Sequence, residues 1–524
     1  MPQESFSHLP SNSAHNEFKV IKLFKSEITI VVLLLTVFVA ANIATSSRLS
    51  TVWLDEVLLT DPAANLYLGH GFTSSAWYYQ TKDEFWACNA PLHAVLLYHW
   101  MKLFGFSLIA VRSLNYGLMA ISVLIIWLSV SRLNLVTSAR SRIILVILLL
   151  LGEGVTFNYL SGRYDCLAIS LFAAALFAYS IQSIWLRCIL LLGIGIFIPI
   201  AGFHLLPYAA ILGTILLIYL GRLFFRESIS LTIGSTIGII FLYILYSTNR
   251  VADIFFVKSL GGHSLGSAIN KSKAPIKGSE SDKIGYVLSN FIEIFANRLT
   301  HLPQWFFQDT SFFILLILAL ALATYQIVNA NFEFRSSLCF GLVVSSFVPL
   351  GLGILRDYPN YYTWMSYIPL AICICSSVTK FRKTNYSFLG NLIILVSLVL
   401  ACLPGYPMTL ISGVQVWGDR DYAKVENFIA TNVREDDKAY SSFGPYYAIK
   451  KRAASVFFPT YMDMISSQEK EGISVLIIQR FEKYAKLSVE DVINKLGGEW
   501  FDTKQRLDSR EYKLMIFRRK QQIL

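Results

Sequence analysis

The sequence has few charged residues for its length. Charged side chains make up 15% of the 524 residues, whereas globular proteins average about 25%. The apolar residues, 55% of the chain, form long uninterrupted blocks such as 143–151 and 312–323. A helix needs about 20 mostly apolar residues to cross the hydrocarbon core of a bilayer. The composition therefore argues against a cytosolic protein and predicts several membrane spans.

The sequence also lacks the patterns of several common sites. None of its seven cysteines forms a CxxC pair, so neither a zinc site nor a disulfide framework is supported. There is no P-loop or GxGxxG turn to hold a nucleotide sugar. The net charge is +11, but the basic residues lie in short clusters between apolar blocks. The positive-inside rule accounts for that excess better than a nucleic-acid partner does.

The apolar blocks predict a polytopic α-helical membrane protein with about eleven spans, with twelve or thirteen as alternatives. The expected spans are 27–46, 112–131, 142–160, 165–184, 186–202, 203–220, 230–247, 311–330, 337–355, 361–379 and 388–404. The segment 91–105 is short for a span, and we expect a helix at the outer interface that begins at Pro91. If 91–105 is not counted as a span, the basic clusters all fall on the same side of the membrane. By the positive-inside rule this side is the cytoplasm, and the amino terminus is expected there.

Three regions are expected along the chain. Residues 1–26 form a cytoplasmic leader, and residues 27–404 form the membrane domain, with long outer loops at 47–111 and 248–308. A loop as long as the second is typical of a lid or binding element. Residues 405–524 are more polar and predict an extracytoplasmic α/β domain, with helices near 421–433 and 488–496 and strands near 475–479 and 512–518.

Two adjacent acids, Asp55 and Glu56, follow the first apolar run closely. Charge near hydrocarbon costs several kcal/mol unless it faces water or a cavity. A carboxylate at the outer end of a helix could act as a general base. The alternative is a pair of flanking acids that only mark the water interface. The spacing does not decide which of the two acts, and we keep both as candidate catalytic residues.

Further candidates lie at the other outer helix ends. Arg163 and Arg356 could bind phosphate with their planar forks of donors, and His204 could meet an anionic headgroup. Asp165 could bind substrate, or it could simply cap the following helix. A lone histidine in apolar surroundings is more often structural. Tyr361 and Tyr362 could contact substrate or belong to an interfacial belt.

The order of these motifs resembles the GT-C membrane glycosyltransferases, most of all the branch of the protein O-mannosyltransferases and the aminoarabinose transferases of lipid A. The resemblance rests on Asp55-Glu56, on Pro91-Leu92-His93 through Leu103-Phe104-Gly105, and on Arg112-Ser113-Leu114. It continues in Ser161-Gly162-Arg163-Tyr164-Asp165, in Gly202-Phe203-His204, and in Tyr361-Tyr362 followed by Pro369. One departure is Cys88-Asn89-Ala90-Pro91, where the lipid A branch has Glu-Lys-Pro-Pro; this leaves Lys82 or Glu84 as substitutes for the lysine.

The resemblance implies an enzyme that transfers a sugar from a polyprenyl-phosphate donor to an acceptor hydroxyl, with inversion, on the outer face of the plasma (inner) membrane. The acceptor would be a lipid, a glycan or a protein of the cell envelope, and membrane lipids would surround the site. No cofactor is certain, and a divalent metal ion stays open because two adjacent carboxylates do not make a site. The alternatives are a transporter or flippase for a lipid-linked substrate and an envelope glycan polymerase or ligase.

Overall fold

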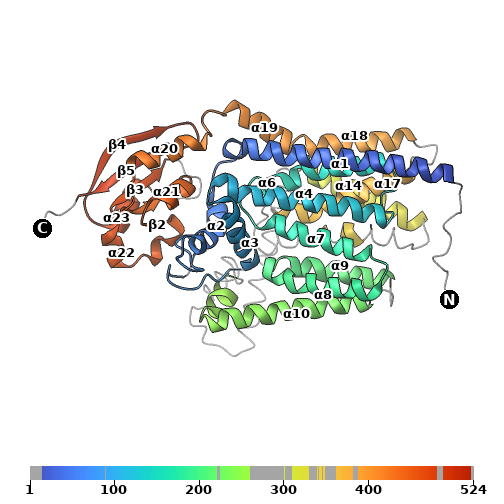
Figure 1. Cartoon of the computed structure of the whole chain (residues 1–524), viewed down its shortest axis with the longest axis horizontal. Helices are drawn as coiled ribbons and strands as arrows, with labels where there is room; N and C mark the ends of the chain where they lie inside the picture. The colour runs from blue at the N-terminus through green and yellow to red at the C-terminus, as the bar shows by residue number, and fades with distance from the viewer. Residues whose placement is uncertain are drawn as a thin grey trace.

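A long body of side-by-side helices carries a small α/β unit at one end (Figure 1). The computed structural model describes residues 14–78, 80–88, 90–220, 225–259, 300, 310–329, 339, 341–344, 346–347, 362–381, 387–480 and 488–520. The helices of the body are α1 (Ala14–Leu49), α4 (Leu108–Arg132), α5 (Ala139–Leu151), α6 (Glu153–Tyr159), α7 (Asp165–Tyr179), α8 (Ile184–Ala201), α9 (Leu205–Leu220), α10 (Phe225–Thr248), α14 (Thr310–Asn329), α17 (Trp364–Phe381), α18 (Ser387–Cys402) and α19 (Tyr406–Gln415). A π-helical turn, η2 (Ile254–Ser259), follows α10.

Five helices within the described residues are long and apolar enough to cross a membrane, or six if one bent pair counts as a span. The multi-span helical architecture is therefore confirmed, but the count of eleven is not. Much of the predicted span 337–355 and of the predicted loop 248–308 lies outside the described residues.

The bent pair corrects one predicted span. Residues 142–160 were expected as one continuous helix, but α5 ends at Leu151 and α6 starts at Glu153, with a 51° bend between them. Gly152 lies at the break, where a Cβ atom would collide with the ring of Tyr367. Gly405 packs against the same break, so close to the backbone of residues 151–153 that it has no room for a side chain.

Two short helices occupy the end of the body that faces the α/β unit. These are α2 (Leu54–Tyr67) and α3 (Pro91–Phe104), and neither reaches the length of a span. Proline in the first turn starts α3 as the sequence predicts, since its missing N–H has no partner there anyway. The loop between them is anchored by α10, because Tyr246 Oη donates to the Cys88 carbonyl at 2.5 Å.

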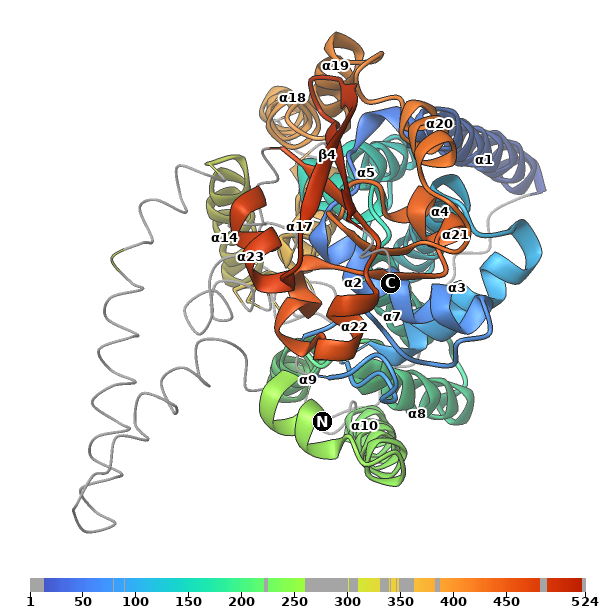
Figure 2. The ribbon, with the colours of Figure 1, turned by 90° about the vertical axis from the view of Figure 1, so that its left-hand side faces the viewer.

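The α/β unit contains a five-stranded sheet in the order β2-β1-β3-β5-β4. Its elements are α20 (Tyr422–Asn432), β1 (Lys438–Ser441), α21 (Tyr446–Arg452), β2 (Ser455–Phe457), η4 (Pro459–Met464), α22 (Ser467–Gly472), β3 (Val475–Gln479), α23 (Val489–Leu496), β4 (Trp500–Asp508) and β5 (Lys513–Arg519). Strands β1, β2 and β3 are parallel, and β3, β5 and β4 are antiparallel. Seen end-on, the unit covers α2 (Figure 2).

One hydrophobic core joins this unit to the body. It includes Val57 of α2 and Leu97 of α3 together with Ile449 of α21 and Ile477 of β3, all fully buried. Because one continuous cluster of buried apolar side chains includes residues of both parts, their docking removes apolar area from water and stabilises the arrangement. The position of α2, and of the acids it carries, therefore depends on residues almost 400 positions further along the chain.

Candidate active site

The two adjacent acids of α2 point in different directions. Asp55 and Glu56 lie in the first turn of the helix, where neighbouring side chains project about 100° apart. Asp55 forms an ion pair with Arg163 and keeps 25% of its side-chain surface exposed. Glu56 pairs with Arg112 and is completely buried. The structure thus separates an accessible carboxylate from an inaccessible one.

Arg163 is held between two carboxylates. Its Nη1 donates to Asp55, and its Nε donates to Asp165 Oδ2 at 2.8 Å. The other oxygen of Asp165 accepts a hydrogen bond from Trp364 Nε1 of α17 at 3.2 Å. Asp165 therefore does more than cap α7, whose cap position is taken by Tyr164. The predicted phosphate-binding role of Arg163 stays a prediction, because two of its three nitrogens already face carboxylates.

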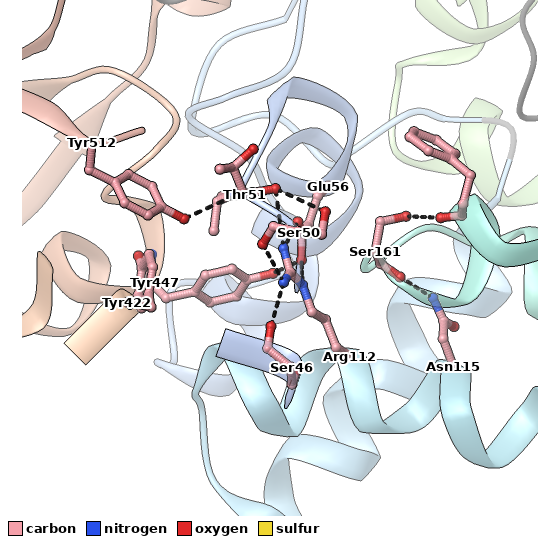
Figure 3. A network of polar contacts seen from close by, with 12 residues as sticks. Ser46, Ser50, Thr51, Glu56, Arg112, Asn115, Ser161, Tyr422, Tyr447 and Tyr512 are labelled. Carbon is pink, nitrogen blue, oxygen red and sulfur yellow. Dashed lines mark hydrogen bonds and ion pairs between the residues drawn. The ribbon is translucent and has the colours of Figure 1, made fainter. Parts of the chain in front are cut away.

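Asn115 of α4 holds the turn that carries Arg163 in place. Asn115 Nδ2 donates to the carbonyl of Ser161 at 2.5 Å (Figure 3). It also donates to the carbonyl of Arg163 at 2.7 Å. Gly162 lies so close to α2 and α4 that a Cβ atom there would sit 3.0 Å from Thr60 Oγ1 and 3.1 Å from Glu56 Cγ. The absence of a side chain lets the turn approach the acid pair closely.

The electrostatics of the cluster favour a base at Asp55. Burial raises the pKa of the Asp55 carboxyl above its usual value of 3.8; Arg163 opposes that shift, and Asp165 adds to it. Nearby on α3, burial lowers the pKa of the His93 imidazole to about 4, so this ring is neutral at physiological pH. A partly exposed carboxylate with a raised pKa can take up a proton more readily than an ordinary aspartate.

An aromatic cluster borders the ion pairs. His204, in the turn between α8 and α9, stacks on Tyr362 with ring centroids 5.1 Å apart. The ring of Tyr164 lies 5.4 Å from His204, and Tyr164 Oη lies 3.4 Å from Tyr362 Oη. Trp364, which bonds Asp165, meets His204 edge-on at 6.4 Å. Trp364 and Tyr164 thus connect the ion pairs of Arg163 with the stacked rings of His204 and Tyr362. The predicted residues Asp55, Arg163, Asp165, His204 and Tyr362 therefore belong to one chain of contacts.

The second acid belongs to a buried network. Arg112 Nε and Nη2 donate to the two oxygens of Glu56 at 2.8 and 2.7 Å, and Arg112 Nη1 donates to the carbonyls of Ser46 and Ser50 (Figure 3). Tyr447 of the α/β unit donates to Glu56 Oε1 at 3.0 Å. A carboxylate with both oxygens engaged and no exposed surface is poorly placed to accept a substrate proton.

Two of the remaining predicted residues, Lys82 and Glu84, contact other parts of the chain. Lys82 pairs with Glu469 of the α/β unit at 2.8 Å, and its N–H donates to Tyr461. Glu84 accepts from the backbone of Thr81 within its own loop. Arg356 and Tyr361 lie outside the described residues. Within the described residues, no group of three or more His, Cys, Asp and Glu side chains could hold a metal ion.

Sequence reasoning missed the residues that fasten α2 to the α/β unit. Asp61 is fully buried and accepts from Tyr446 Oη at 3.1 Å, pairs with Lys450 Nζ at 2.8 Å, and receives Ser74 and Ser75. Glu56 and Asp61 thus meet consecutive tyrosines of α21. An acid five positions after another acid in an apolar segment is a signal of burial, but it does not identify the partner.

The sequence matches no family model and no curated protein at a significant level. The structure has the fold of the GT-C superfamily of membrane glycosyltransferases, as the resemblance in the sequence predicts. It is similar to ArnT from Cupriavidus metallidurans bound to undecaprenyl phosphate, with a TM-score of 0.56, 12% identity, and 94% of this chain and 97% of that chain covered.

Weaker similarities exist to two further solved structures. The oligosaccharyltransferase of Archaeoglobus fulgidus in complex with Zn and sulfate gives a TM-score of 0.49 at 10% identity, covering 85% of this chain and 67% of that one. Arabinofuranosyltransferase AftD from Mycobacteria gives 0.43 at 12% identity, covering 93% and 40%. At such identities the likeness concerns the fold alone, and the activity has to be argued from the site.

Proposed function

We propose that this protein is an integral membrane glycosyltransferase that moves a sugar from a polyprenyl-phosphate donor to an acceptor hydroxyl. One observation carries the proposal: on a GT-C fold, a partly exposed Asp55 is held by a buried Arg163 beside an aromatic cluster. This is the arrangement that a general base at a sugar site requires, namely an accessible carboxylate with a fixed orientation.

In this proposal Asp55 takes the proton of the acceptor hydroxyl. The hydroxyl oxygen forms a bond to the anomeric carbon, and the bond from that carbon to the phosphate oxygen breaks on the opposite face, which inverts the centre. The polyprenyl phosphate leaves with the electron pair. Arg163 and Asp165 position the base, while His204 and Arg356 are the residues that we assign to the leaving phosphate, where negative charge develops.

The proposal includes the orientation expected from the sequence. The amino terminus is cytoplasmic, about eleven helices span the plasma membrane, and reaction takes place at the outer face, where the α/β domain of residues 405–524 covers α2. The membrane domain comprises residues 27–404. Lys82, Glu84, Tyr361 and Tyr362 remain candidate substrate contacts, and a divalent ion remains open as a cofactor.

Transfer can be tested directly with a labelled polyprenyl-phosphate monosaccharide. We expect the purified protein, reconstituted in vesicles with envelope extract as acceptor, to move label into a product that no longer carries the polyprenyl phosphate. A transporter would instead deliver the intact labelled lipid to the other leaflet. A polymerase or ligase would leave the monosaccharide donor untouched and use only preassembled glycans. Either result would replace the proposal.

The pH dependence of transfer provides a second test. A base must be deprotonated to act, so kcat/KM falls as the pH drops through the pKa of Asp55. Because burial raises this pKa, we expect the acid limb of the profile above pH 3.8. Arg163→Gln removes the cation that lowers the pKa and should move the limb to still higher pH. A limb at the ordinary aspartate value, unmoved by Arg163→Gln, would contradict the assignment.

A further inference from the structure

The Arg163 guanidinium lies between the beginnings of α2 and α7. Each helix supplies a carboxylate from its first turn, Asp55 from α2 and Asp165 from α7. Each also has an aromatic ring at its start. Arg163 Cζ lies over the Trp53 ring, 5.7 Å from its centre, and over the Tyr164 ring at 5.6 Å. Both distances are within the roughly 6 Å over which an aromatic face attracts a cation. Two acids and two rings therefore hold one buried guanidinium.

The two rings stand where helices usually carry another kind of residue. Trp53 and Tyr164 are the N-cap residues of α2 and α7, and neither makes a side-chain cap hydrogen bond. Ser, Thr, Asp and Asn are preferred at this position because their side-chain oxygen accepts from a backbone N–H of the first turn. Both helices forgo that bond at the point where they meet Arg163. Contact with the guanidinium is the physical reason that the structure offers for the two rings.

The orientation of Asp55 depends on this guanidinium. Within the described residues, Asp55 makes no hydrogen bond or ion pair except with Arg163. The donors of a guanidinium lie in its plane, so the two carboxylates restrain it along its edge, whereas aromatic rings can restrain it by contact with its faces. Removing a ring would allow the guanidinium to tilt, and the carboxylate of Asp55 would lose its fixed partner.

Trp53 is the ring that belongs to the same segment as Asp55, two residues before it. The indole contacts Arg163 and also Phe157 of α6, whose ring meets it at an angle of 65° with the centroids 5.1 Å apart. The backbone of Trp53 is fixed as well, because its carbonyl accepts the first hydrogen bond of α2, from Val57 at 3.2 Å. Trp53 therefore joins the start of α2, the guanidinium and α6 at one point.

We propose that Trp53 is a positioning residue of the site, whose indole ring holds the Arg163 guanidinium in the orientation that directs the Asp55 carboxylate to the acceptor. The indole acts through Arg163 and does not contact the substrate. This inference rests on the proposed function for the role of Asp55 as the base. The effect of Trp53 on the ion pair can nevertheless be measured without turnover.

A looser ion pair has a defined electrostatic consequence. Burial raises the pKa of Asp55, Arg163 opposes that shift, and Asp165 adds to it. On α3, burial keeps His93 neutral by lowering its pKa to about 4, and Glu56 is compensated within its own buried ion pair. Arg163 is thus the group that favours the charged form of Asp55. If the guanidinium moves away, the pKa of Asp55 rises further.

The test is an infrared titration of the full-length protein in nanodiscs without substrate. The signal of the protonated Asp55 carboxyl is isolated by subtracting the spectrum of the same protein with Asp55→Asn. We expect Trp53→Leu to raise the midpoint by about half a pH unit, a size that the loss of one cation–π contact can cause. Trp53→Phe keeps a ring and should titrate near the parent. Trp53→Met is the second ringless variant should Trp53→Leu fold poorly.

Two controls decide whether the effect passes through the guanidinium. In the Arg163→Gln background, Trp53→Leu should cause no further shift, because both changes break the same contact. Trp500→Leu is the matched control: Trp500 of β4 lies 5.0 Å from Cζ of Arg519, and no described contact connects this pair with Asp55. It removes a tryptophan from an arginine in the same way and should leave the midpoint unchanged.

An unchanged midpoint in the ringless variants, or a shift that persists in full in the Arg163→Gln background, would overturn the inference. If Trp53→Leu left the titration unchanged but raised the KM for donor or acceptor, Trp53 would be a substrate contact instead. The titration does not depend on sugar transfer. Failure of the proposed function would therefore be recognised separately, as a parent protein that transfers no sugar while the shift in Trp53→Leu is still observed.

Discussion

Replacing Asp55 with asparagine is expected to lower the rate of sugar transfer by about 10²–10⁴-fold, the range typical of a lost general base. Asparagine keeps the size of the side chain and an oxygen that can accept from Arg163, so the ion-paired turn should retain its shape. The amide cannot take the proton of the acceptor hydroxyl. The measurement is kcat with a labelled polyprenyl-phosphate sugar under saturating acceptor.

A matched control is available in the loop after α2. Asp83→Asn makes the same chemical change at an exposed acid that no described contact connects with Asp55. It should transfer sugar at the unsubstituted rate. If purified Asp55→Asn also worked normally, while eluting and melting like the parent protein, Asp55 would not be the base. The proposed mechanism would then fail with it.

The second large effect is expected on folding rather than on chemistry. Glu56→Ala leaves the Arg112 guanidinium buried at 1% exposure without its carboxylate. Removing one partner of a buried ion pair costs about 3–5 kcal/mol, since the remaining charge loses its compensation. We expect a large drop in the midpoint of thermal unfolding and a low yield of monodisperse protein in detergent.

Tyr447→Phe provides the graded comparison. It removes the hydroxyl that donates to Glu56 Oε1 at 3.0 Å, and a lost hydrogen bond to a charged group costs about 1.5–3 kcal/mol. Its melting point should fall between those of the parent and Glu56→Ala. Should Glu56→Ala instead melt like the parent and lose transfer alone, the catalytic role first considered for Glu56 would be restored.

The sequence predicts many of the candidate site residues, but it does not predict which partner each of the two adjacent acids has. Asp55 and Glu56 stand out because two acids beside an apolar run are costly. Helical periodicity indicates that the side chains of adjacent residues point in different directions. It does not indicate which of the two acids contacts Arg163 and which contacts Arg112. That choice depends on the packing of α2 against two other helices. Arg112 itself carried a signal, since an arginine at the start of an apolar span usually has a buried partner.

Long-range contacts could not be predicted at all. Nothing in the composition of residues 405–524 indicates that Tyr446 and Tyr447 reach the two buried acids of α2, because one sequence carries no pairing information across almost 400 residues. The break at Gly152 was hidden for another reason. Glycines occur often in membrane helices, so the run 142–160 reads as continuous until Tyr367 and Gly405 are seen to crowd the same point.

The contacts between α21 and α2 affect how results from truncated forms of this protein should be interpreted. Tyr446, Tyr447 and Lys450 contact two acids of α2, Glu56 and Asp61, that lie five positions apart. The α/β unit therefore helps to fix the position of α2, and with it the position of Asp55, the residue that we propose as the proton acceptor. If a fragment without this unit were inactive, the displacement of α2 and Asp55 would be enough to explain the loss. The result would not show whether the unit contacts a substrate.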